Sequence, residues 1–363
     1  MASPTVEAAL HLKLANAGHA APSADNSQPW HYYWDGSALI VEYDHKRVQG
    51  LTFPPQAPAT LLSIGGVVEH MWQAAETLKV PITLDIFPQE CATPGCYARI
   101  AIQAEGHSAD SNLKQHVLYG RHTNRFRFST KPIPTDMLQP LEQMSQNSAC
   151  TAVLVEKDAI STAAKLVRSA SEVRFQTQEI HEWLGQSLRF PETDVKIADG
   201  LDIRTLDLPP GGRLFLKFIS DWRRIRLLNK IGIYKILANI DAAPLKRVPV
   251  VVAVIGENTP TGALDAGRLL SRTWIHLNSL GLAVHPYFVV SDQIFRLQEN
   301  TVPPHLVSQI QDVDRETREL FDLADNQVLY MLLRVGYPTR KAPRSLRLPL
   351  EKVFTDLSQS HQD

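Results

Sequence analysis

The apolar residues in the first third of the chain recur with two different periods. In residues 58–78 they lie three or four positions apart, which predicts a helix with one apolar face and with Glu69 and His70 outside it. Residues 6–17 have the same period and stop before Gly18, a residue that commonly terminates helices. Runs of aromatic and β-branched residues predict four strands, at 32–34, 38–43, 82–87 and 97–103.

A similar order of elements recurs after residue 118, with additions. The pattern predicts helices at 141–145, at 161–188 with a break, and at 265–280, and strands at 248–255, 284–290 and 327–335. Gly65 and Trp72 in the first long helix have the same spacing as Gly267 and Trp274 in the second. A strand also precedes and follows each of these helices, so the chain is expected to contain two similar halves, 1–118 and 119–363.

An insertion at residues 199–248 interrupts the second half. Its helical part, residues 213–237, carries seven basic residues and one acidic residue, Asp221. A basic amphipathic helix is one signature of a protein that lies on a membrane. The apolar face is too broad for a purely superficial helix, however, so the prediction is a flap packed on the protein with a cationic outer face.

Composition and charge narrow the class of protein. The 363 residues are 44% hydrophobic, enough for one large or two ordinary domains with buried cores. A formal net charge of −1 gives no global reason to bind nucleic acid or an anionic membrane. The most apolar run, residues 248–256, is half the length that a bilayer requires, and residues 1–14 lack the pattern of a signal peptide. We therefore expect a cytoplasmic protein with a small-molecule partner.

The three cysteines cannot form a disulfide framework. Cys91 and Cys96 have no second pair of ligands of the kind that zinc sites use nearby in the sequence, so no metal site is expected there. They are predicted to be thiols on either side of a turn.

Residues 20–30, Ala-Ala-Pro-Ser-Ala-Asp-Asn-Ser-Gln-Pro-Trp, form the most distinctive stretch. Pro22 and a second proline near its end fix the backbone, while Ser23, Asn26 and Gln28 offer a hydroxyl and two carboxamides between them. Such a stretch is either a turn whose side chains bond their own backbone or a pre-organised polar edge that contacts a ligand.

Two later stretches concentrate cations. In an extended conformation of residues 119–126, Arg121, Thr123 and Arg125 would point to one side, and two guanidinium groups beside a hydroxyl suit a phosphate monoester. The alternative is a solvated basic stretch at a domain junction. Arg344 and Arg347 lie in a tail punctuated by prolines and could reach one anion, although surface charge is the commoner cause of such residues.

These stretches, in this order, resemble three motifs of the nitroreductase superfamily of FMN-dependent proteins. The first resembles the flavin-facing loop, and the second resembles the pattern Arg-His-Ser-x-Lys that holds the FMN phosphate and ribityl chain, with Thr123 in place of serine and Arg125 in place of lysine. The tail resembles the C-terminal segment whose cations complete the phosphate pocket, and residues 281–286 resemble the segment that passes the flavin N5 edge. The cofactor-binding residues that the resemblance implies are Pro22, Ser23, Asn26, Gln28, Arg121, His122, Thr123, Arg125, Pro286, Arg344 and Arg347.

The resemblance implies an α+β, nitroreductase-like fold of two pseudo-symmetric halves, each with a central, mostly antiparallel sheet flanked by helices. Ordinary members are homodimers, and this chain resembles two such subunits fused into a pseudo-dimer that could pair further. The loop of residues 20–30 occurs once, as does the Arg-His-Thr-Asn-Arg segment. One complete FMN site per chain is therefore expected.

The function that the resemblance implies is an FMN-dependent oxidoreductase that transfers hydride between NADH or NADPH and a small organic acceptor of the nitro, quinone or enone type. A related flavin-dependent dehydrogenase would run the same chemistry in reverse. The chemistry is centred on the flavin, so no catalytic side chain is expected. The alternative is a flavin-binding or flavin-sequestering protein without turnover, in which the insertion at 199–248 covers the site as a lid.

Overall fold

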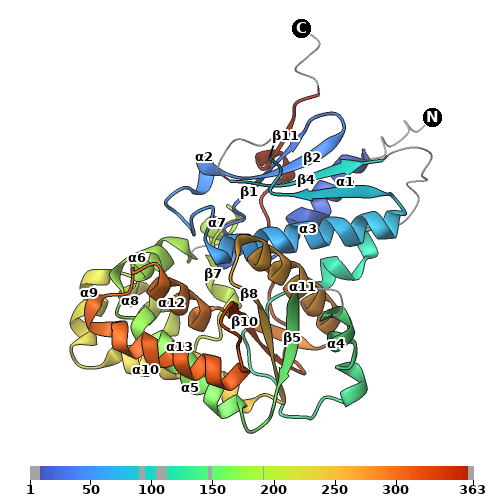
Figure 1. The fold of residues 1–363 in the computed structure, drawn as a ribbon. Coiled ribbons are helices and arrows are strands. Elements are labelled where there is room, and N and C mark those ends of the chain that lie inside the picture. The colour runs from blue at the N-terminus through green and yellow to red at the C-terminus, as the bar shows by residue number, and fades with distance from the viewer. Residues whose placement is uncertain (1–8, 90–94, 104–112, 146–148, 191, 359–363) are drawn as a thin grey trace.

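The computed structural model describes residues 9–89, 95–103, 113–145, 149–190 and 192–358. They form an α+β fold with two larger sheets, a short third sheet, and helices between and around them (Figure 1). The predicted fold class is confirmed.

The first sheet has five strands in the order β11-β1-β2-β4-β3. The strands β1 (Trp30–Trp34), β2 (Ala38–Tyr43), β4 (Cys96–Ile102) and β3 (Ile82–Ile86) pair antiparallel, as the hairpin pattern predicted. The last strand, β11 (Phe354–Asp356), pairs parallel to β1, with Tyr32 opposite Phe354. The C-terminal part of the chain thus crosses back to the first sheet.

The second sheet has four strands in the order β5-β8-β10-β9, and all its pairs are antiparallel. Its strands are β5 (Cys150–Val155), β8 (Val250–Glu257), β9 (Ala283–Tyr287) and β10 (Gln327–Gly336). Alternate residues of β8 enter different cores, Val252 and Val254 on one face and Val251 and Ala253 on the other. Burial on both faces explains why this strand is apolar without interruption.

The helices largely follow the predicted positions. The expected break in residues 161–188 separates α5 (Ile160–Arg174) from α6 (Gln178–Ser187). The other helices are α1 (Leu10–His19), α2 (His45–Val48), α3 (Pro58–Leu78), α4 (Pro140–Ser145), α7 (Glu192–Val195), α8 (Gly212–Ile219), α9 (Trp222–Asn229), α10 (Ile233–Ala242), α11 (Pro260–Ser279), α12 (Val289–Gln298) and α13 (Val307–Phe321). Strand β5 and helices α12 and α13 were not predicted.

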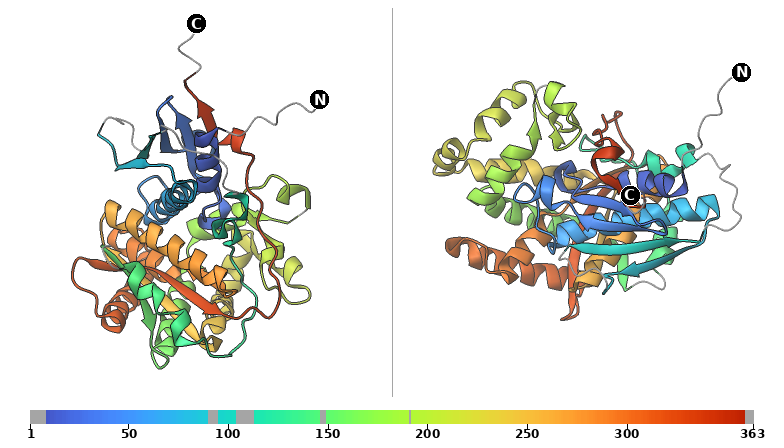
Figure 2. Two further views of the ribbon diagram at one scale, coloured as in Figure 1. Left: turned by 90° about the vertical axis from the view of Figure 1, so that its right-hand side faces the viewer. Right: turned by 90° about the horizontal axis from the view of Figure 1, so that it is seen from above.

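Helices α3 and α11 pack against each other between the two sheets, as Figures 1 and 2 show from different sides. Glu69 of α3 is 1% exposed and makes a bidentate ion pair with Arg272 of α11, with both N–O distances 2.8 Å. His70 is also buried, and its Nδ1 lies 3.1 Å from the carbonyl oxygen of Ala17. The prediction that α3 has one apolar face was therefore incomplete, because α11 covers a second face.

The insertion forms three short helices instead of one long one. Helix α10 packs on α5 and α9 packs on α6, so the insertion rests on the second half as predicted. Each helix turns only a few apolar residues inward, among them Ile219, Ile225 and Ala238. The basic side chains of residues 213–237 are exposed, as the predicted cationic outer face requires, but large apolar side chains are exposed beside them.

A short parallel sheet pairs β6 (Leu188–Arg189), which precedes the insertion, with β7 (Leu201–Asp202), which lies near its start. Cys96 is disulfide-bonded, which corrects the prediction of a thiol, whereas Cys91 lies outside the described residues. None of the helices that the structure describes is both long and apolar enough to cross a bilayer.

Candidate functional site

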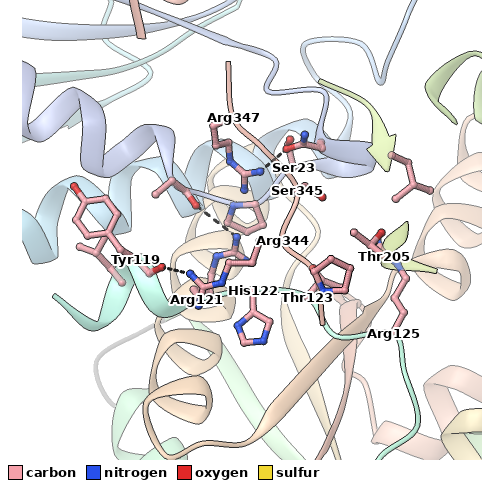
Figure 3. Close-up of a pocket in the computed structure, with 16 residues that line it drawn as sticks. Ser23, Tyr119, Arg121, His122, Thr123, Arg125, Thr205, Arg344, Ser345 and Arg347 are labelled. Atoms are coloured by element: carbon pink, nitrogen blue, oxygen red, sulfur yellow. Dashed lines mark hydrogen bonds between the residues drawn. The ribbon is translucent and has the colours of Figure 1, made fainter. Parts of the chain in front are cut away.

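A pocket lies where four segments of the chain meet (Figure 3). The loop before β1, the segment that follows residue 117, the start of the insertion and the C-terminal tail each contribute to it. Nine of the predicted site residues line it, and Gln28 and Pro286 do not. The lining residues are Ala20, Pro22, Ser23, Asn26, Leu118, Tyr119, Arg121, His122, Thr123, Arg125, Leu201, Thr205, Pro343, Arg344, Ser345 and Arg347.

Arg121 is the most unusual side chain of the pocket. It is 8% exposed, and its guanidinium carbon lies 4.7 Å above the ring of Trp274. Its Nη2 is 3.5 Å from the carbonyl oxygen of Ala20, while Nε and Nη1 are buried with no hydrogen-bond partner. Unpartnered donors on a buried cation carry a large desolvation cost, and an anion bound beside them would offset that cost.

Two further cations surround Arg121. Arg344 donates to the carbonyl oxygens of Tyr119 at 2.7 Å and Gly120 at 2.9 Å. Arg347 is half-buried, donates to the carbonyl oxygen of Ala21 at 2.9 Å and has an unpartnered Nε. Burial, together with the charges of Arg347 and Arg344, lowers the pKa of Arg121 well below its usual value. A bound anion would oppose that effect.

Burial also lowers the pKa of Arg347, to about 10. None of the described residues that line the pocket is acidic. Arg121, Arg344 and Arg347 therefore form a cluster of three guanidinium groups without a carboxylate, which we call the cation cluster. Its geometry suits a dianionic phosphate monoester, whose oxygens accept several charge-assisted hydrogen bonds.

Helix α11 holds the segment that carries Arg121. The backbone N–H of His122 donates to Oδ1 of Asn278 at 2.8 Å, and Nε1 of Trp274 donates to the carbonyl oxygen of His122 at 3.1 Å. Trp274 therefore supports Arg121 twice, through its ring face and through its N–H. Burial lowers the pKa of His122, so its ring is neutral near pH 7.

Arg125 lies on the other side of the pocket, beside Thr205 (Figure 3). Its Nη1 is 3.3 Å from Oγ1 of Thr205, and its charged neighbours include Asp25 and Asp241. Burial lowers the pKa of Arg125 and raises that of Asp25. Arg121 and Arg125 both line the pocket, but at different sides of it (Figure 3).

The loop of residues 20–30 adopts a rare backbone conformation. Asp25, Asn26 and Gln28 have positive φ values of 46°, 59° and 50°. Such values cost free energy in residues other than glycine, and surrounding contacts must hold them. Ser23 contributes one such contact, because its Oγ accepts from the backbone N–H of Gln28 at 2.9 Å.

Gln28 supplies most of the remaining contacts. Its side chain is fully buried, and its Nε2 donates to the carbonyl oxygens of Asn26 and Ala198, each at 3.0 Å. Its Oε1 accepts from the backbone N–H of Leu348 at 2.9 Å. The side chain thus joins the loop to residue 198 and to the C-terminal tail, and both its nitrogen and its oxygen are hydrogen-bonded to the backbone.

Asn26 has a similar position at the pocket wall. Its Nδ2 donates to the carbonyl oxygens of Leu346 at 3.0 Å and Ala198 at 3.4 Å, and its Oδ1 accepts from Arg347. Pro286 lies in β9, opposite Leu333 of β10, away from the pocket lining. In this structure, the carboxamides of Asn26 and Gln28 therefore face protein groups.

Sequence analysis missed several residues of the site. Leu201 and Thr205 come from the insertion, and no local signal marks them. Trp274 and Asn278 act from behind the pocket. The repeat of Gly65 and Trp72 at Gly267 and Trp274 pointed to the helix but not to this role.

Comparison with known proteins gives distant relatives. No family model matches the chain. It is 23% identical over 326 residues to the uncharacterized protein MT1398 of Mycobacterium tuberculosis, a match that covers 85% of this chain and 43% of that protein. The chain thus spans less than half the length of this curated relative.

Among solved structures, the chain is similar to the FMN-dependent nitroreductase NfnB of Mycobacterium smegmatis in complex with NADPH. The identity is 14%, the match covers 66% of this chain and 95% of that chain, and the TM-score is 0.38. It is also similar to an FMN-dependent nitroreductase of Clostridium difficile, with 10% identity, coverage of 63% and 89%, and a TM-score of 0.33.

Proposed function

We propose that the pocket binds FMN, with the phosphate of the cofactor on the cation cluster. The observation that carries the proposal is Arg121, which has two buried N–H-bearing nitrogens without partners in a pocket lined by no acidic side chain among the described residues. Hydrogen bonds to charged groups contribute about 1.5 to 3 kcal/mol each. Three of the stretches that resemble the nitroreductase superfamily contribute to this pocket: the loop of residues 20–30, residues 119–126 and the C-terminal tail.

The proposed site draws on both halves, 1–118 and 119–363, which we propose act as the two subunits of a pseudo-dimer. Pro22, Ser23 and Asn26 belong to the first half. The cation cluster and Thr123 belong to the second. A chain with either half alone would have only part of the site.

We propose that the protein is an oxidoreductase of the nitroreductase type that acts in the cytoplasm. Bound FMN would supply hydride transfer between NADH or NADPH and a small organic acceptor of the nitro, quinone or enone type, or the reverse reaction in a dehydrogenase. The residues of the chain would hold the cofactor. The cation cluster would bind its phosphate, and Ser23 keeps a hydroxyl hydrogen to donate, since its Oγ accepts from Gln28. No side chain is assigned to proton transfer.

A second function is favoured by the start of the insertion. Leu201 and Thr205 line the pocket, and the carbonyl oxygen of Ala198 accepts from Gln28 and from Asn26. This segment is placed to cover bound cofactor. A flavin-binding protein that retains its cofactor without turnover therefore stays the alternative.

The decisive experiment combines flavin content with turnover. We expect purified protein to be yellow, or to become yellow with added FMN, and Arg121→Ala to bind FMN about 10- to 100-fold more weakly than the wild type. Arg99→Ala is the matched control, because Arg99 pairs with Asp35 on the partly exposed first sheet. Protein that stays colourless after incubation with FMN would contradict the proposal.

Oxidation of NADH or NADPH with a nitroaromatic or a quinone then separates the two functions. Steady turnover supports the oxidoreductase. A yellow protein that no donor reduces supports the flavin-binding alternative.

A further inference from the structure

The insertion carries most of the exposed apolar side chains of the described part of the chain. Of the 13 large hydrophobic residues exposed there, seven lie between residues 214 and 240. Leu214 is 75% exposed and Ile231 is 78% exposed. Large apolar patches on a protein surface mark a site of contact with a partner.

The exposure follows from the geometry of the three short helices. In α8, Leu214 and Phe215 lie four and three positions before Phe218, so both neighbour it on the exposed side, whereas Ile219 is buried. In α10, Ile236 and Ile240 repeat the outward spacing of four residues. Helix α9 contacts both α8 and α10, so the three helices that carry these side chains are neighbours (Figure 1).

Basic side chains are interspersed with these apolar ones. All seven basic residues of the segment 213–237 are exposed, and Asp221 is its single acidic residue. Asp221 caps α9 and pairs with Arg224, so it is already engaged. The segment carries a net charge of +6 in a chain whose formal net charge is −1. The charge is therefore strongly asymmetric.

We propose that α8, α9 and α10 form a surface that docks on an anionic lipid bilayer, which we call the insertion surface. Short helices with apolar side chains beside Lys and Arg lie in the interface of membranes, where the apolar groups enter the acyl boundary and the cations contact lipid phosphates. The sequence alone favoured a packed flap and no membrane. The exposed apolar side chains favour the alternative, a basic amphipathic segment that lies on a membrane surface.

Charge complementarity selects this partner over a second copy of the chain. Two insertion surfaces that met face to face would bring like charges together, which opposes association. A bilayer that contains anionic lipid has the complementary charge over an extended area. The inference depends on this surface and not on the proposed cofactor.

The test is flotation of the full chain with vesicles in a density gradient. We expect the protein to float with vesicles of phosphatidylglycerol and phosphatidylcholine, not with phosphatidylcholine alone, and to be released by salt. Leu214→Ser with Phe215→Ser should reduce partitioning at least about tenfold. Lys217→Glu with Lys230→Glu should also reduce it. Leu51→Ser is the matched control, because Leu51 is 56% exposed on the first half.

Three outcomes would overturn the proposal. One is the absence of flotation with either type of vesicle while circular dichroism shows a folded protein. Another is flotation that none of the insertion variants reduces. The third is concentration-dependent self-association in sedimentation experiments that the serine variants abolish, because the surface would then bind a second copy.

Discussion

Gly65 and Gly267 lie opposite each other where α3 crosses α11. A Cβ atom on Gly65 would lie 2.0 Å from the carbonyl oxygen of Leu264, and a Cβ atom on Gly267 would lie 2.2 Å from that of Leu62. Each glycine therefore faces the residue three positions before the other glycine. A two-fold relation between the halves requires such reciprocal contacts. At both glycines the backbone of one helix approaches the backbone of the other.

The crossing predicts the effect of adding one methyl group. Gly65→Ala or Gly267→Ala should lower the free energy of unfolding by about 3 kcal/mol, because the contacted atoms belong to the backbone and cannot move aside cheaply. Urea unfolding measures the change. Gly66→Ala is the control in the same helix, since its Cβ would meet its nearest atom at 3.4 Å. It should be neutral or stabilising by up to about 1 kcal/mol. Equal losses at positions 65 and 66 would contradict this packing.

The cation cluster predicts that Arg121 and Arg125 contribute unequally to FMN binding. Arg121→Ala should weaken FMN binding more than Arg125→Ala, because Arg121 faces two other guanidinium groups while Arg125 faces Asp25 and Asp241. Fluorescence titration with FMN gives both dissociation constants. A larger loss at Arg125 would place the phosphate on the other side of the pocket.

The loop of residues 20–30 and the Arg-His-Thr-Asn-Arg segment each occur once in the sequence, which predicts one flavin per chain. The ratio of flavin absorbance to protein concentration should approach one at saturation. A ratio near two would mean that the other side of the pseudo-dimer also binds the cofactor.

The contacts of Gln28 predict a link between the loop and the insertion. Gln28→Ala removes hydrogen bonds to Ala198, Asn26 and Leu348 and should cost about 2 to 4 kcal/mol of stability. Amide hydrogen exchange should quicken in residues 198–205. Gln103→Ala, at an exposed glutamine, is the control. Unchanged exchange in the insertion would show that other contacts hold it.

Buried histidines predict a loss of stability in acid. His19 accepts from Nε1 of Trp30 at Nδ1, so its Nε2 carries the hydrogen donated to the carbonyl oxygen of Leu348. Burial lowers its pKa from 6.5 to about 4. His19 therefore becomes protonated below about pH 6.5 in the unfolded chain, but only below about pH 4 in the folded chain. The contribution of His19 is complete above this window and is lost as the pH falls through it.

In His19→Gln, the dependence of unfolding free energy on pH should become shallower by up to about 1.4 kcal/mol per pH unit in that window. Urea unfolding at several pH values measures the slope. His305→Gln, at an exposed histidine, is the control. Identical slopes in wild type and His19→Gln would contradict the assignment.

The sequence could predict those residues of the candidate pocket that lie together in one short stretch of the chain. Pro22, Ser23 and Asn26 share one short loop, and Arg121 to Arg125 share another, so the resemblance of each continuous stretch to a nitroreductase motif was enough to single them out. Leu201 and Thr205 could not be found in this way, because their approach to the pocket depends on how the insertion folds back. The same limit applied to Gln28, whose partners lie in segments distant in sequence.

Local periods and terminating residues were enough to predict the positions of most helices and strands, including the bounds of α3. The amino-acid sequence also shows the asymmetry of charge in the insertion. Long-range packing determines that α3 is covered on two faces, that β11 returns to the first sheet, and that Arg121 joins Arg344 and Arg347 while Arg125 does not. The physical reason is that burial and charge depend on every segment that packs around a residue, and the chain supplies those segments from far along its length.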